Sequence, residues 1–163
     1  MKRIFTTGLA LMLTSMSFTS VHSQDALPTT AGELFHRSQY ELVAPIFQYC
    51  MTKMPNTRDT LSKMDLQFKE KIAAAVKPIA IKYPEEWNAP VTAEEAEKTL
   101  AVLNMMSSQT LPQIEKTGAE VYCPTFIARL ESTSVEDLSK KIMPSFEKYN
   151  ENRSKLGVNF PSK

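Results

Sequence analysis

The chain has 163 residues, with 19 basic and 18 acidic side chains, two cysteines and ten prolines. This near-neutral balance leaves no basic excess to neutralise phosphates, which argues against a nucleic-acid-binding protein. The length suits one domain whose core is large enough to need few covalent links.

Residues 1–23 have the three-part layout of a secretory signal peptide. Lys2 and Arg3 precede an uncharged, mostly apolar stretch, and small polar residues then lead to a cleavage site after Ser23. Cleavage would leave 17 basic and 18 acidic residues, a net charge of −1. No later stretch approaches the roughly 18 apolar residues of a membrane span. We therefore expect an exported protein, periplasmic or secreted, without a membrane anchor in the mature chain.

Two capping signals open the mature chain. Thr30-Ala-Gly-Glu33 and Ser38-Gln-Tyr-Glu41 both have the Ser/Thr-x-x-Glu form that begins helices. Pro45 falls inside the second stretch and predicts either a kink or a fresh helix start. The helix that carries Cys50 has to end before Pro55.

The next helix, capped by Asn56 or Thr57, has the longest apolar stripe in the chain, formed by Leu61, Met64, Phe68, Ile72, Ala75 and Ile79. Two prolines in the stretch 83–90 mark a break around the only tryptophan. Thr92-Ala-Glu-Glu95 is a further capping box and opens a second long helix. Its stripe consists of Ala96, Leu100, Leu103, Ser107, Leu111 and Ile114, and Gly118 is placed to end it in a left-handed cap.

Helical patterns continue over 121–131 and from a Ser134 cap to Tyr149, after which the apolar periodicity fades. We predict a single domain over 24–150 and a loosely ordered tail over 151–163. The fold class is all-α, a compact bundle of about five helices with the two long helices as an antiparallel pair.

Cys50 and Cys123 each lie on an apolar face at helical spacing, Cys50 four residues after Ile46 and Cys123 four residues before Ile127. In an oxidising compartment, two such cysteines predict one structural disulfide that joins two shorter helices. Two buried free thiols or one reactive thiol are the alternatives. Cys50 lacks the cationic or helix-start setting of a reactive thiol.

Catalytic and cofactor motifs are sparse. After cleavage, His36 is the only histidine, so a histidine metal pair and a Ser-His-Asp triad lack their usual parts. There is no glycine-rich phosphate loop either. We therefore predict no catalytic residue, no metal site and no cofactor.

Two weaker patterns keep an enzymatic alternative open. His36 lies three residues after Glu33, where the pair could exchange a proton. Glu85 and Glu86 beside Trp87 combine acids with an aromatic ring, as carbohydrate sites do.

Met105 and Met106 are the methionines least explained by packing, because adjacent helical positions cannot both face a core. Thioethers adapt to apolar ligands or partner surfaces, and they can also ligate cuprous copper. We therefore predict a partner-binding patch from Glu85, Glu86, Trp87, Met105 and Met106.

The main functional prediction is a non-enzymatic exported protein that binds another protein. In size, export and composition the chain resembles small helical immunity proteins that neutralise toxins, although no motif carries this resemblance. One alternative is a periplasmic carrier or chaperone for a small apolar ligand or metal. The other is an enzyme that uses His36 or the pair Glu85 and Glu86.

Overall fold

The computed structural model describes residues 26–155, apart from the side chain of Ser154, and this part of the chain is helical without a strand. The helices are α1 (Ala31–Glu41), α2 (Ala44–Lys53), α3 (Arg58–Lys82), α4 (Pro84–Trp87), α5 (Ala93–Thr117), α6 (Ala119–Ser132) and α7 (Val135–Lys155), with a 3-10 turn η1 (Pro55–Thr57) before α3. The predicted all-α class is confirmed. The predicted signal peptide lies outside the described residues.

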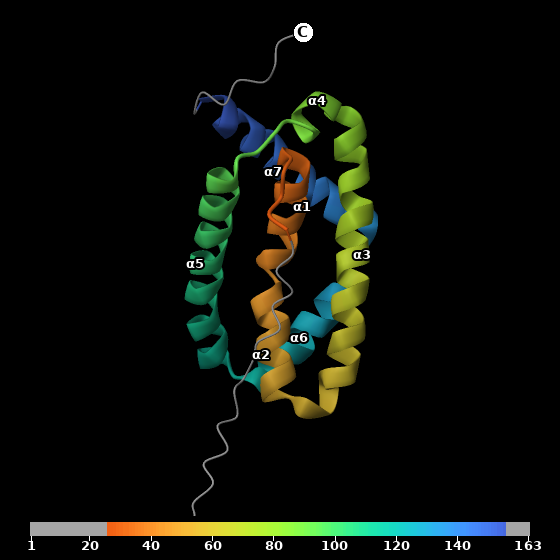
Figure 1. Cartoon of the computed structure of the whole chain (residues 1–163). Coiled ribbons are helices and arrows are strands. Elements are labelled where there is room, and N and C mark those ends of the chain that lie inside the picture. The colour runs from red at the N-terminus through yellow and green to blue at the C-terminus, as the bar shows by residue number, and fades with distance from the viewer. Residues whose placement is uncertain (1–25, 156–163) are drawn as a thin grey trace, which may run out of the picture.

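The two long helices α3 and α5 run in opposite directions, as predicted, but they are not direct neighbours. α1 and α2 follow one another as a broken column between them (Figure 1). This column contacts α3 on one side and α5 on the other, while α7 packs along α3. α1 and α2 carry buried apolar side chains, among them Leu34, Phe35 and Phe47. These side chains are kept from solvent only if other helices pack on both sides of the α1–α2 column.

Of the two predicted capping signals, only the first begins a helix: Ser38 lies inside α1, where its hydroxyl donates to the Phe35 carbonyl at 2.6 Å. The backbone N–H of Glu33 donates to Thr30 Oγ1 at 3.2 Å, and the Glu33 carboxylate accepts from the Thr30 N–H at 3.2 Å, which completes the capping box. α1 ends at Glu41, and α2 begins afresh with Pro45 in its first turn. Of the two outcomes predicted for Pro45, the fresh start is the one observed.

The core is built on α3. All six residues of its predicted stripe are buried. Cys50 on α2 and Cys123 on α6 form a disulfide with fully buried side chains and a Cα–Cα distance of 5.7 Å. The predicted bond between two shorter helices is therefore confirmed. It links two segments that are 73 residues apart in the sequence.

The predicted boundary of the tail is wrong, because α7 continues to Lys155. The side chain of Arg153 is only 4% exposed. Its Nε donates to Glu95 Oε1 at 2.7 Å, and its Nη2 donates to the carbonyl oxygen of Pro90 at 2.8 Å. A charged residue that is buried in an ion pair does not contribute to an apolar pattern. The apolar periodicity of the sequence therefore ended before the helix did.

At the start of α5, the Glu95 carboxylate bonds to α7 instead of closing the predicted capping box. Thr92 Oγ1 accepts from the Glu95 N–H at 3.1 Å, as a capping box requires. The Glu95 carboxylate binds Arg153 on α7. Pairing the carboxylate with the buried guanidinium stabilises the fold more than capping the helix end would, since an unpaired buried charge is costly.

The other end of α5 stops at Gly118, whose φ is 85°. Its N–H donates to the carbonyls of Ile114 and Glu115, and α6 begins at the next residue. The predicted left-handed cap is right only in the sign of φ, because ψ of 138° places the backbone outside the left-handed helical region. α5 is thus held at one end by α7 and at the other by α6, which the disulfide fixes to α2.

Candidate functional site

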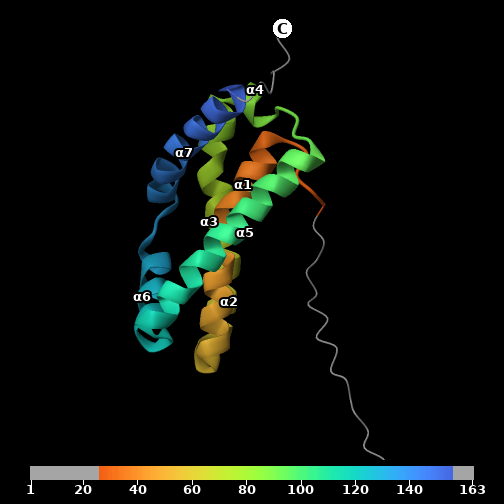
Figure 2. The same cartoon turned by 90° about the vertical axis from the view of Figure 1, so that its left-hand side faces the viewer.

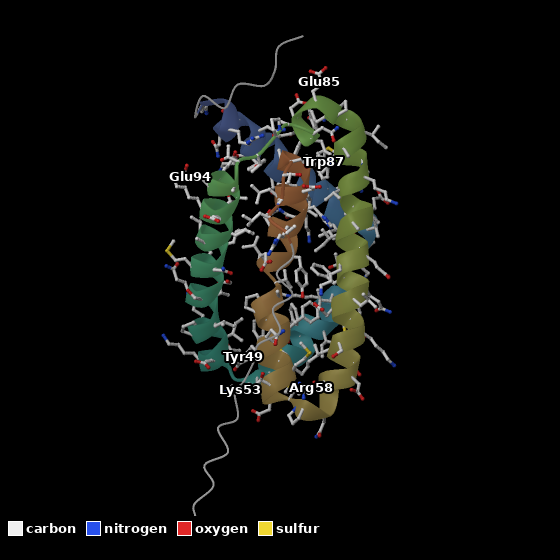
Figure 3. The ribbon with its side chains drawn as sticks, in the orientation of Figure 1. Tyr49, Lys53, Arg58, Glu85, Trp87 and Glu94 are labelled. Carbon is white, nitrogen blue, oxygen red and sulfur yellow. A yellow bond between two sulfur atoms is a disulfide. The ribbon has the colours of Figure 1, made fainter. Side chains whose placement is uncertain are left out.

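Trp87, predicted to bind a partner, is half-buried and packs against the core. It ends the short helix α4, and its ring lies 5.4 Å from the ring of Phe146 between centroids. A Cβ atom placed on Gly32 would be 2.2 Å from Trp87 Cε2, so the indole ring covers the backbone of α1 (Figure 3). Position 32 therefore favours glycine, because a side chain there would overlap the indole ring.

Substitution of this glycine gives the first stability prediction. We expect Gly32→Ala to displace the indole ring and to cost about 1–3 kcal/mol, the usual range for an overpacked core. Because Trp87 is the only tryptophan, its emission should shift to longer wavelength while thermal unfolding moves to lower temperature. In a Trp87→Phe background the same glycine change should cost clearly less, because the smaller ring leaves room for the methyl group. An equal cost in both backgrounds would show that the close contact is not the cause.

Glu85 and Glu86 precede the tryptophan on α4 and differ in exposure. Glu85 is exposed at the outer end of α4, and Glu86 is half-buried (Figure 3). A carbohydrate site needs carboxylates that face one another across the bound sugar, beside an exposed ring. Here the ring is turned toward Phe146 and Gly32. The structure therefore does not bring the three residues together as an acid and aromatic site.

His36 and Glu33 are not paired either. The Glu33 carboxylate accepts hydrogen bonds from the backbone and hydroxyl of Thr29 at 2.8 and 2.9 Å, and these bonds lower the pKa of Glu33. Burial lowers the pKa of His36, which favours its neutral form at pH 7. Among the described residues, no group of three or more His, Cys, Asp or Glu side chains is placed to hold a metal ion.

A pocket between α3 and α6 bears on the carrier alternative. Met64, Phe68 and Leu130 contribute to its lining, and its volume is about 20 Å³. That volume suits a water molecule, whereas small-molecule sites usually measure several hundred Å³. This pocket is therefore too small for a carried ligand.

Met105 and Met106, two residues of the predicted partner-binding patch, lie on the surface of α5. They are 54% and 50% exposed, and Val102, one turn earlier, is 50% exposed. Together with Gln109 these residues form what we call the α5 face. α5 stands at the edge of the bundle, and its outer side is uncovered by other helices (Figure 2).

The sequence around this face is free of charge. No Asp, Glu, Lys or Arg occurs from Thr99 to Ile114, a stretch of 16 residues. Only three residues of the whole helix are buried, namely Ala96, Ser107 and Ile114. Exposed helices usually carry charged residues on their outer side, so this neutral face is unusual.

The predicted patch is thus divided between two places. Trp87 lies in α4 against the core, whereas Met105 lies twelve residues into α5, about 18 Å along the helix axis. Val102 was missed by the sequence reasoning. Its spacing of three and four residues from the two methionines was the available signal, since it places all three on the side opposite the buried stripe.

None of the helices in residues 26–155 is long and apolar enough to cross a membrane. In the comparisons with known proteins, no family model, curated protein or solved structure matches this chain.

Proposed function

We propose that this chain is an exported, non-enzymatic protein that binds a protein partner through the α5 face. The observation that carries the proposal is the exposure of Val102, Met105 and Met106 within five positions of one helix. Other exposed apolar residues, such as Leu66 and Ile81 on α3, are scattered singly, as is normal for protein surfaces.

The composition of the α5 face supports a protein partner. The cores of protein interfaces are depleted of charged residues and enriched in methionine. Methionine side chains are flexible and polarizable, so they adapt to the shape of an apolar partner surface. A helix fixed at both ends also presents its side chains with little ordering cost on binding.

Export is supported by two independent features. The first 23 residues follow the pattern of a signal peptide. The buried disulfide is typical of proteins that fold in an oxidising compartment. A partner would therefore be met in the periplasm or outside the cell.

A capture experiment tests this function. A tagged chain that begins at Gln24 is mixed with envelope extract, and recovered proteins are identified by mass spectrometry. We expect one partner in near-equal amount, which then binds the purified chain directly. The double change Met105→Lys and Met106→Lys should weaken that binding at least about tenfold, because two charges would replace the apolar centre of the interface.

The matched control places lysines at Leu66 and Ile81, which are 60% and 80% exposed on α3. This variant has the same added charge on another face and should bind normally. Equal binding by the two lysine variants would contradict the assignment of the α5 face. Absence of any partner in repeated capture would count against the function itself.

A further inference from the structure

We propose that residues 156–163, which follow α7 and lie outside the described residues, cover the α5 face of their own chain until a partner displaces them. The inference rests on the function proposed above, because it concerns the regulation of the same face. Three observations carry it: the place where α7 ends, the side-chain pattern of the residues that follow, and their reach.

The last turn of α7 meets α5 at the head of the α5 face. Arg153 Nε donates to Glu95 Oε1 at 2.7 Å, in the first turn of α5 (Figure 1). Val102 and Met106 follow Glu95 by seven and eleven residues, close to two and three full turns, so all three project from the same side of the helix. Lys155, the last described residue, comes two positions after Arg153. The chain therefore leaves α7 beside the α5 face.

The residues after α7 have the pattern of a segment with one apolar side. Leu156, Val158 and Phe160 alternate with Gly157 and Asn159. In an extended segment, alternate side chains point to the same side, so the three apolar residues would form one row. No Asp, Glu, Lys or Arg occurs from 156 to 162. Such a row can lie on the apolar α5 face without removing a charge of its own from water.

The reach of the segment matches the position of the face. Met105 lies ten residues after Glu95, about 15 Å along the axis of α5. Gly157 permits the backbone conformations of a tight reversal, which turns the chain back along α5. The six residues after it span about 20 Å when extended. Phe160 is then level with Val102, one turn before Met105.

Attachment to α7 makes a weak contact sufficient. A segment joined by a short linker has an effective concentration in the millimolar range at its site. A contact of millimolar affinity therefore covers the α5 face about half of the time. A partner has to displace the segment, so its apparent affinity is reduced in proportion to the uncovered fraction.

Photocross-linking of the mature chain at micromolar concentration tests the inference. Phe160 is replaced by benzoylphenylalanine, which on irradiation inserts into nearby C–H bonds and favours methionine side chains. We expect a cross-link to Met105 or Met106 within one chain, identified by peptide mass spectrometry. The change Met105→Lys with Met106→Lys should remove this product. Cross-links to other parts of the chain only, or none at all, would overturn the inference.

Oxidation by hydrogen peroxide gives an independent readout, because a covered thioether reacts more slowly. Val158→Ser with Phe160→Ser should speed oxidation of both methionines of the α5 face at least about twofold, since the uncovered fraction rises from about half to nearly one. Asn159→Ser with Pro161→Ser, the matched change on the opposite side of the segment, should leave the rate unchanged. Met51 on α2 is the internal reference. Equal rates in all chains would contradict the coverage.

The outcomes separate this inference from the proposed function. If the methionines are never protected while Met105→Lys with Met106→Lys still weakens a captured partner, the function stands and the coverage is overturned. If they are protected but no partner is ever captured, the coverage stands and the function fails. Where both hold, Val158→Ser with Phe160→Ser should tighten partner binding about twofold, because the competing segment is removed.

Discussion

Loss of the Cys50–Cys123 disulfide is expected to lower the melting temperature by more than about 10 °C. The bond closes a segment of 73 residues. In the chain-entropy model a loop of this length stabilises the folded state by about 4 kcal/mol, and each kcal/mol corresponds to a few degrees. The effect should be seen by calorimetry or circular dichroism, either after reduction or in the double variant Cys50→Ala and Cys123→Ala.

The double variant under reducing conditions is the control for this experiment. It should melt at the same temperature with and without reductant, since it has no bond to lose. Oxidised wild-type protein with a melting temperature equal to that of the variant would show that the bond does not stabilise the fold. Loss of the bond should destabilise α6 and the end of α5 most, because the bond fixes α6 to α2.

Removal of the buried guanidinium is the second large effect. We expect Arg153→Ala to cost about 3 kcal/mol, the lower end of the range for breaking a buried ion pair, because Glu95 is 24% exposed and retains some hydration. The change also leaves the Pro90 carbonyl without its hydrogen bond from Arg153 and uncovers the ring of Tyr149. Burial raises the pKa of that tyrosine to about 12.

Thermal and chemical unfolding would measure this cost. Lys155→Ala is the matched control, since it removes one positive charge from the same turn of α7 at an exposed position beside Glu151. It should be nearly neutral. Arg153→Lys should recover only part of the stability, because an ammonium group cannot reproduce the two-pronged contact with the Glu95 carboxylate. If Arg153→Ala proved as neutral as the control, the ion pair would not hold α5 against α7.

Most of the local predictions succeeded, although the Ser38 capping signal did not, since Ser38 lies within α1. The Thr30 capping box, the restart at Pro45 and the positive φ at Gly118 each depend on residues within about one helical turn. The stripe of α3 depends on a repeat along one helix. These features needed no knowledge of the remaining chain.

The candidate site was predicted only in part. Met105 and Met106 are both exposed, whereas their adjacent positions required only that they should not both face the core, and Val102 extends the same face. Trp87 was predicted together with them, but it packs against the core. Whether an aromatic ring in a short turn faces solvent or core depends on what lies opposite. That neighbour is Gly32, more than 50 residues earlier, and its missing side chain makes the space.

The sequence by itself determined the helical class, most helix starts and the disulfide, since only two cysteines were available to pair. The tertiary structure alone decided that α1 and α2 lie between the long helices, that Arg153 is buried on Glu95, and that the outer side of α5 is left uncovered. The physical reason is the distance along the chain over which each interaction acts. Caps and stripes act over a few residues, whereas the Arg153–Glu95 contact joins positions 58 residues apart and appears only when the helices pack.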